Sequence, residues 1–238
     1  MIETTKLHCC RKCGSQDIVK NGKDYKGSQK YLCKGCKAAA TLEPVEAYTF
    51  ERKIEILKVY QERASMRGIQ RAFGVARTTL ASWLERLADC LPTVEETLEE
   101  PRPDDILELD ELWSYVYSRD NKRWVWIALC RRTRQIVAYY VGDRTAESAK
   151  KLWCRIPAVY RKCKSFSDYW EAYEKTFPNN TAVGKESGET NHVERWNNTL
   201  RQRIGRFVRK SLSFSKSDFF HEVALLFFII THNLASIS

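Results

Sequence analysis

The sequence lacks any run of about 18 apolar residues, which is the length that a membrane-spanning helix requires. Its longest strongly apolar stretch, Val223–Ile230, is typical of a buried helix segment. The first 14 residues contain no apolar core of the kind found in secretory signal peptides. We therefore expect a cytoplasmic protein with no membrane partner. No repeat of solenoid period is present either, which excludes a repeat architecture.

The composition is not that of a disordered chain. Hydrophobic residues make up 43% of the 238 positions, and seven Trp are present, so one or two domains with a packed core are expected. The formal net charge is +10, with a net +6 in residues 1–42 and six Arg or Lys without any acid in residues 195–210. This excess favours a polyanionic partner, although solubilising charge explains it equally well.

Residues 92–105 contain three Pro and six acidic residues but few apolar ones. A segment of this composition is not expected to pack into a core, so it predicts a linker. It separates an N-terminal portion, residues 1–91, from a C-terminal portion, residues 106–238.

Cysteine is concentrated near the N-terminus. Four of the nine form two Cys-x2-Cys pairs: Cys10, Cys13, Cys33 and Cys36. Two such pairs predict a small zinc-ribbon-like finger over residues 1–45, in which four thiolates surround one Zn²⁺. Gly14 and Gly35 are expected to permit the turns. Because Cys9 and His8 adjoin the first pair, the ligand set stays open, and four reduced cysteines without metal are the alternative.

Residues 46–91 show the apolar periodicity of helices. One helix is expected around 65–73 and a second around 80–87, with a break at 74–76, which predicts a helix-turn-helix. The second helix would present polar side chains to a DNA major groove: Arg77, Thr78, Thr79, Ser82 and Arg86. The net acidity of residues 43–100 leaves a helical pair that does not bind DNA as the alternative.

The C-terminal portion is predicted to be α/β. Residues 106–117, 123–130 and 135–141 are rich in β-branched and aromatic residues and predict three strands in an antiparallel meander. A helix at about 145–155, a short strand ending at 165–168, a loop over 178–190 and a helix from about 190 follow. This order resembles that of a ribonuclease-H-like fold.

Three acidic residues suggest a catalytic site. Asp110 interrupts an apolar strand, Asp168 follows a strand, and Glu194 lies early on a helix that carries Arg201 on the same face. Such oxygen donors suit Mg²⁺ or Mn²⁺, and two such ions can promote attack at phosphorus. Glu108 and Glu111 are alternative first carboxylates, and all of these acids could instead be ordinary surface charges.

Three blocks of sequence resemble the transposases of the insertion-sequence-one family. The first comprises the two cysteine pairs with the segments 18–22 and 29–36 between and around them. The second comprises 109–113, 167–170 and Tyr173, and the third comprises 193–197, 200–202 and 209–216. The blocks run in family order and cover nearly the whole chain.

The resemblance implies a DDE-type transposase with a ribonuclease-H-like catalytic domain. Matched residue by residue, it implies the acids Asp110, Asp168 and Glu194, the basic residue Arg201, and the zinc ligands Cys10, Cys13, Cys33 and Cys36. It implies double-stranded DNA as partner, both element ends and target, with a homodimer or higher oligomer acting at the nucleoid. Further basic residues would position phosphates by charge: Arg203, Arg206, Arg209 and Lys210.

The resemblance also shows one departure from the family. Archetypal members divide the two portions between overlapping reading frames, whereas here both lie in one continuous chain. Two rival functions stay open at this point. One is a zinc-dependent DNA-binding regulator with an inert C-terminal domain, and the other is a ribonuclease-H-like nuclease that cuts without joining strands.

Overall fold

The computed structural model describes residues 7–24, 27–42, 48–208, 210 and 212–237. The chain divides into two compact units, Met1–Lys53 and Ile54–Ser238, so the boundary falls inside the first helix. Residues 54–91 of the predicted helix-turn-helix segment therefore belong to the same compact unit as the C-terminal sheet.

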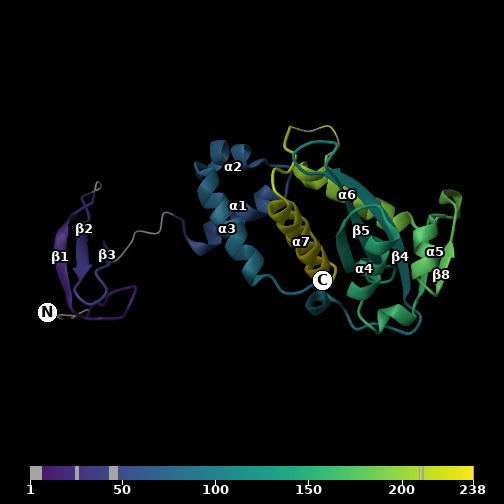
Figure 1. The fold of residues 1–238 in the computed structure, drawn as a ribbon, viewed down its shortest axis with the longest axis horizontal. Helices are drawn as coiled ribbons and strands as arrows, with labels where there is room; N and C mark the ends of the chain where they lie inside the picture. Colours follow the sequence, from purple (N-terminus) through teal and green to yellow (C-terminus); the bar gives the residue numbers. More distant parts are fainter. Residues whose placement is uncertain (1–6, 25–26, 43–47, 209, 211, 238) are drawn as a thin grey trace. The chain divides into compact units, whose positions relative to one another are not determined.

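The first unit contains a small antiparallel sheet of β1 (Ile18–Lys23), β2 (Gln29–Cys33) and β3 (Ala39–Thr41) (Figure 1). Each cysteine pair lies in a tight turn. In the first, Gly14 has a φ of 74° and its N–H donates to the Cys10 carbonyl at 2.8 Å. In the second, the left-handed residue is Lys37, with a φ of 58°, and not Gly35 as predicted. The Lys37 N–H donates to the Cys33 carbonyl at 2.9 Å, so the two turns have the same hydrogen-bond pattern, and in each the left-handed residue directly follows the second cysteine.

Three helices follow: α1 (Phe50–Tyr60), α2 (Met66–Phe73) and α3 (Arg77–Cys90). The Ser65 hydroxyl accepts a hydrogen bond from the Gly68 N–H at 3.0 Å and so caps the start of α2. Gly74 ends α2 with a φ of 72°, which confirms the predicted break between two short helices. Ile69, Val75 and Leu80 are buried at this turn and hold α2 against α3.

A five-stranded sheet forms the centre of the second unit, in the order β6-β5-β4-β7-β8. The strands are β4 (Ile106–Tyr115), β5 (Lys122–Cys130), β6 (Ile136–Gly142), β7 (Lys164–Ser167) and β8 (Asn180–Ala182). β4, β5 and β6 form the predicted antiparallel meander, whereas β7 runs parallel to both β4 and β8.

Helices cover both faces of this sheet (Figure 1). On one face, α4 (Ala146–Arg155) and α5 (Glu171–Thr176) pack against Leu107, Leu109 and their neighbours. On the other, α6 (Asn191–Arg203) and α7 (Asp218–Ala235) pack against Leu112 and Val125. Because side chains alternate along a strand, β4 presents its odd-numbered residues to α4 and α5 and its even-numbered residues to α6 and α7. Short 3-10 helices complete the unit: η1 (Glu95–Thr97), η2 (Tyr160–Lys162), η3 (Lys185–Ser187) and η4 (Gly205–Phe207).

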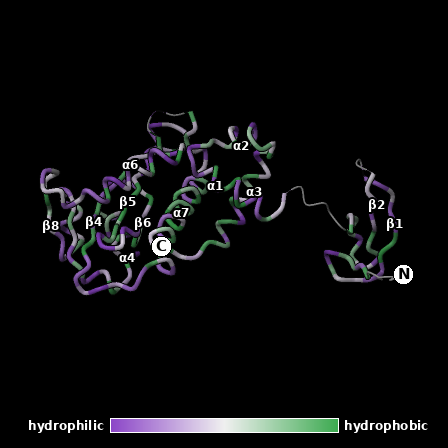
Figure 2. The backbone as a smooth tube through the Cα atoms, turned by 180° about the vertical axis from the view of Figure 1, so that it is seen from behind, coloured by the Kyte–Doolittle hydropathy of each residue, from purple (hydrophilic) through white to green (hydrophobic). Residues whose placement is uncertain are grey.

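Helix α7 is, by length and composition alone, apolar enough to cross a membrane. Its hydrophobic residues are prominent in Figure 2. Leu225, Phe228 and Ile229 are nevertheless buried against the sheet, as the apolar stretch predicted. Polar atoms of the same helix are also bonded inside the unit, since the Asn233 side chain donates to the Ile136 carbonyl at 2.9 Å. These contacts are those of a core helix in an α/β domain.

Two predictions for the C-terminal portion need correction. Residues 92–105, expected to stay outside the core, lie against the sheet: Thr97 and Asp105 are buried, and Arg132 Nε donates to Asp105 Oδ1 at 2.7 Å. Gln135 bonds the segment further, through the Glu99 N–H and the Thr97 carbonyl. The segment predicted as a loop, 178–190, contains β8, whose three residues are too few to show a periodicity in sequence.

Candidate active site

Asp110 and Glu111 lie where one edge of β4 has no neighbouring strand. β4 pairs with β5 from Leu107 to Tyr115, but with β7 only over 106–108. Asp168 directly follows β7. Continuing the parallel register from Glu108 opposite Phe166 by two residues places Asp168 level with Asp110. The sheet thus brings two of the predicted acids to the same edge.

The third predicted acid comes from α6, which covers the face of the sheet that Asp110 points to. Glu194 lies in the first turn of this helix, and the Thr190 hydroxyl donates to its Oε1 at 3.3 Å. Arg201 lies two turns further along the same helix. Spacing of three, four or seven residues keeps side chains on one helix face, so Glu194 and Arg201 lie on the same side.

These segments line one cavity of about 310 Å³ that is open to solvent. Its lining includes every residue predicted to be catalytic: Asp110, Asp168, Glu194 and Arg201. The other lining residues are Leu109, Glu111, Trp124, Arg144, Val183, Thr190, Asn197 and Asn198. Folding therefore collects three carboxylates from β4, from the end of β7 and from α6 around one space.

Glu108, an alternative first carboxylate, has another role. It is fully buried, and its Oε2 accepts from the backbone N–H groups of His192 and Val193 at 2.9 and 3.1 Å. Its Oε1 accepts from Arg131 Nε at 2.8 Å and lies 2.6 Å from His192 Nδ1. Thr190, the residue that precedes α6, makes no side-chain capping bond. Glu108 therefore caps α6 from the neighbouring strand.

Glu111, the second alternative, lines the cavity but is neutralised inside the protein. Its Oε1 accepts from Arg144 Nε at 2.9 Å, and its Oε2 accepts from the Tyr173 hydroxyl at 2.9 Å. The Arg144 guanidinium in turn lies between two indole rings, 4.8 Å from the centroid of Trp124 and 4.7 Å from that of Trp170. Both oxygens of Glu111 are thus engaged, which favours Asp110 as the acid on β4 that is left for a ligand.

The pKa shifts in the cavity also favour Asp110 as the acid that is left for a ligand. Burial, together with the negative charges of Glu111 and Asp168, raises the pKa of Asp110 from 3.8 to about 7, although the hydrogen bond from Asn197 lowers it. Burial and the charge of Asp168 also raise the pKa of Glu111. Carboxylates held this close oppose one another's ionisation until a cation enters. The oxygen donors present are those that a hard divalent cation prefers.

Sequence reasoning missed Asn197 and Arg144. The Asn197 amide donates to Asp110 Oδ2 at 2.7 Å. Its position three residues after Glu194 places it on the same helix face, a spacing that could have been noticed. No spacing in the sequence indicates Arg144, because its place in the cavity depends on its contacts with Trp124 and Trp170.

The predicted DNA-contacting residues of α3 differ in exposure. Arg77, Thr78 and Arg86 are exposed, whereas Thr79 and Ser82 are half-buried. Arg86 Nη2 also donates to the Ser82 hydroxyl, at 3.4 Å. The exposed side chains are available to a polyanion, and the two half-buried ones are less so.

The basic residues at the end of α6 and directly after it partly contact the region of α1. Arg203 Nε donates to Glu62 Oε1 at 2.9 Å, and Arg206 Nε donates to the Tyr60 hydroxyl at 2.7 Å. Lys210 is exposed. Arg209, predicted with them, lies outside the described residues. The sequence showed the charge of this run but could not show which charges fold back onto α1.

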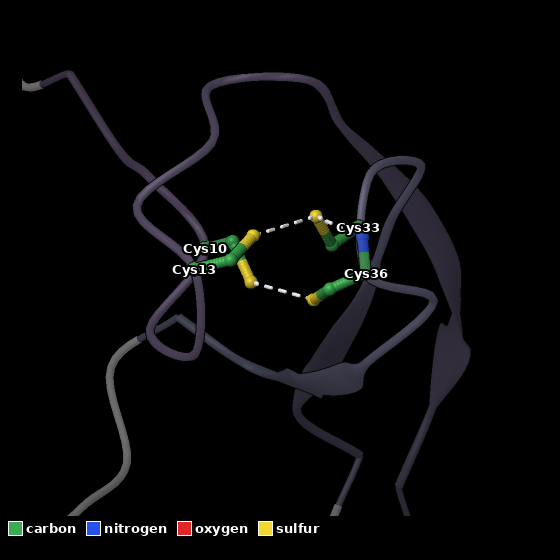
Figure 3. A group of neighbouring side chains, drawn as sticks. All are labelled: Cys10, Cys13, Cys33 and Cys36. Carbon is green, nitrogen blue, oxygen red and sulfur yellow. Dashed lines mark hydrogen bonds between the residues drawn. The ribbon is translucent and has the colours of Figure 1, made fainter.

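The four cysteines of the first unit converge as predicted (Figure 3). Cys10 Sγ lies 3.6 Å from Cys36 Sγ, Cys13 Sγ lies 3.6 Å from Cys33 Sγ, and all four sulfurs lie within 4.8 Å of one another. Zinc–sulfur bonds of about 2.3 Å in a tetrahedron separate the sulfurs by about 3.8 Å. The cluster therefore has the size and donor type of a four-cysteine metal site. Cys9 is exposed and lies outside the group.

Backbone donors favour thiolate within this cluster. The N–H groups of Cys13 and Lys12 lower the pKa of Cys10 from 9.0 to about 6. Hydrogen bonding from the Cys36 N–H likewise lowers the pKa of Cys33. At Cys13 the Ser15 N–H also lowers the pKa, but the contacts with the three other thiols outweigh it and raise the pKa, because neighbouring thiols cannot all ionise without a cation. A depressed thiol pKa is what a metal ligand needs, because the thiolate is the form that binds.

Similarity to a known protein family covers the C-terminal portion of the chain, which contains this cavity. The protein-family model described as IS1 transposase matches residues 106–235, more than half of the chain. Over 129 residues the chain is 37% identical to the insertion element iso-IS1n protein InsB of Shigella dysenteriae, covering 53% of this chain and 95% of that protein. It is 36% identical over 115 residues to the insertion element IS1 protein InsB of Shigella flexneri, covering 48% and 86%. The chain therefore belongs to the IS1 transposase family.

Proposed function

We propose that the chain is a DDE-type transposase with a ribonuclease-H-like catalytic domain. The observation that carries this proposal is the single cavity lined by Asp110, Asp168, Glu194 and Arg201. The element order of three antiparallel strands, a helix, a parallel strand and a later helix on the opposite face supports the proposed fold. Family membership supports transposition as the overall activity.

The three acids are proposed to hold Mg²⁺ or Mn²⁺. Asp110, Asp168 and Glu194 supply only oxygen donors, and their mutual repulsion favours a bound cation. A divalent cation held there would supply activation of an attacking oxygen and stabilisation of the leaving oxygen at phosphorus. Arg201, on the same helix face as Glu194, would bind a phosphate oxygen of the DNA strand and orient it.

The proposed reaction has two steps. Hydrolysis of one strand at the terminal inverted repeat frees a 3′-OH, and this 3′-OH then attacks a target phosphodiester in line. Both steps would use the same acids, because each replaces one oxygen on phosphorus by another. Two element ends must be processed together, so we propose that a homodimer or higher oligomer acts on DNA at the nucleoid.

The N-terminal region is proposed to hold the element end. The four cysteines would bind Zn²⁺ as a structural ion, and α2 and α3 would act as a helix-turn-helix with Arg77 and Arg86 toward the DNA. Arg203 and Arg206 already contact Glu62 and Tyr60, so the exposed Lys210 is better placed than these two arginines to bind phosphate.

The test separates DNA binding from chemistry. Asp110→Asn, Asp168→Asn and Glu194→Gln each keep the side-chain size but remove a charge that would hold the cation. Each variant should bind a labelled inverted-repeat duplex like the parent and cleave it slower by orders of magnitude. The three losses should not add, because the acids act as one unit. Glu174→Gln, an exposed acid on α5, is the matched control and should cleave normally.

The same assay distinguishes the rival functions. Cleavage by Glu194→Gln at the parental rate would remove Glu194 from the site, and Glu186 or Glu189 would replace it as the candidate. Glu189 is a weak substitute, since Arg131 Nη2 lies 2.7 Å from its Oε2. A parent that cuts but never joins its 3′-OH to a target would be a nuclease. A parent that binds ends but never cuts would be a regulator.

A further inference from the structure

Asn197 is a buried polar side chain of the cavity, and packing alone does not explain why an amide stands at this position. It is 3% exposed, and its Nδ2 donates to Asp110 Oδ2 at 2.7 Å. Its Oδ1 is also buried, and within the described part of the chain it has no hydrogen-bond partner. A buried amide oxygen without a partner opposes folding, and a leucine of similar size would not carry this cost. The bond to Asp110 is therefore the contribution that distinguishes this amide from an apolar side chain.

Asp110 differs from its acidic neighbours in how it is held. The Glu111 carboxylate is fixed at both oxygens, by Arg144 and by Tyr173. Asp110 receives its side-chain hydrogen bond from Asn197, at one oxygen. A backbone hydrogen bond from Glu111 also acts on the Asp110 carboxylate. A carboxylate offers about four lone-pair positions, so these two bonds restrain the group and still leave positions for a cation.

The position of Asn197 relative to Asp110 is set by the attachment of α6 to β4. Glu108 lies two residues before Asp110 on the same face of β4, and it binds the first N–H groups of α6. Asn197 lies further along α6 and meets Asp110. The helix is thus joined to the strand at two points, and Glu194 lies on the helix between them.

We infer that Asn197 is a positioning residue that holds the Asp110 carboxylate in its cation-binding orientation. The inference rests on the proposed function, because it assigns Asp110 to the cation site. A side chain that orients a metal ligand contributes to metal affinity without touching the metal, and its loss weakens binding about 10–100-fold.

The experiment measures Mn²⁺ binding to the zinc-loaded full-length protein by electron paramagnetic resonance, without any DNA. Asn197→Leu removes the amide but keeps the side-chain volume, and should weaken the tightest Mn²⁺ site about 10–100-fold. The protein's Tm without Mn²⁺ should stay close to that of the parent. Gln202→Leu is the matched control, since Gln202 is an exposed amide on the same helix and does not line the cavity. It should bind Mn²⁺ like the parent.

A double-mutant cycle shows whether Asn197 acts through Asp110. Asp110→Asn alone should weaken Mn²⁺ binding, and adding Asn197→Leu should weaken it little further. An equal loss in both backgrounds, or parental Mn²⁺ affinity in Asn197→Leu, overturns the inference. If Asn197→Leu does not fold, Asn197→Ala replaces it, because alanine cannot overpack the site. If neither variant folds, Asn197 is required for folding, and this result also overturns the inference. Unchanged Mn²⁺ binding in Asp110→Asn would instead refute the proposed cation site itself.

Discussion

Replacing Glu108 by glutamine should damage the protein although this acid is not proposed to bind the metal. Each carboxylate oxygen takes part in two contacts, with two backbone N–H groups at Oε2 and with Arg131 and His192 Nδ1 at Oε1. Glutamine keeps one accepting oxygen and turns an NH₂ group toward the other pair of donors. The NH₂ group cannot accept hydrogen bonds. The two partners at the oxygen that it replaces therefore lose their acceptor and face the donating NH₂ group instead.

The size of the effect follows from these contacts. A hydrogen bond to a charged group contributes about 1.5–3 kcal/mol, so losing the bonds at one oxygen should lower the free energy of unfolding by about 3–5 kcal/mol. For a unit of this size each kcal/mol lowers the Tm by about 2–4 °C, which gives a fall of roughly 6–20 °C. A shift of α6 by about 1 Å would also displace Glu194 and reduce end cleavage about 100-fold.

Thermal unfolding followed by circular dichroism checks the stability, and the inverted-repeat duplex assay checks cleavage. Glu147→Gln is the control, because Glu147 is exposed and its contact with Lys151, at 3.5 Å, is a surface ion pair of small value. A Tm for Glu108→Gln within about 2 °C of the parent would refute the capping role of Glu108. Normal stability with lost cleavage would instead return Glu108 to the list of metal ligands.

Three further outcomes are expected. Cys33→Ser should reduce bound zinc measured by elemental analysis, whereas Cys90→Ser, an exposed cysteine outside the cluster, should not; undiminished zinc would remove Cys33 from the ligand set. Arg77→Ala and Arg86→Ala should weaken binding of the full chain to the element end and lower the salt dependence by about 0.9 per lost phosphate contact; unchanged binding isotherms would place recognition elsewhere. Burial lowers the pKa of His221 from 6.5 to about 4, so the fold holds it neutral and stability falls as the pH drops from 6.5 toward 4. This contribution is about 3 kcal/mol and should vanish in His221→Gln, which a comparison of urea unfolding at pH 7 and pH 4.5 measures against the parent.

Local patterns in the sequence predicted most of the secondary structure correctly. The alternating apolar residues of 106–117 form β4, and the periodic residues around 80–87 lie within α3. These predictions succeeded because strand alternation and helix periodicity are properties of neighbouring residues. β8 and the packing of 92–105 were missed because both depend on distant partners, β7 for the strand and Gln135 and Arg132 for the segment.

The acids of β4 show more clearly that sequence patterns cannot predict contacts with distant segments. Glu108, Asp110 and Glu111 lie within four residues, and the sequence alone left all three as candidates for the same role. Glu111 differs from the other two because successive side chains of a strand point to opposite faces. Glu108 and Asp110 share a face, and they differ because they meet different positions along α6. Glu108 meets the start of α6, Glu111 meets Arg144 and Tyr173, and Asp110 meets the cavity.

By itself the sequence determined the residue types available for chemistry, namely paired cysteines, separated carboxylates and a basic excess, together with the family resemblance. It also determined most of the regular elements, because propensity and periodicity act over a few neighbours. Only the tertiary structure decided which carboxylates share a cavity, which are neutralised by Arg131 or Arg144, and that Asn197 bonds to Asp110. Those outcomes depend on burial and on contacts between segments far apart in the chain, and no short stretch of sequence contains that information.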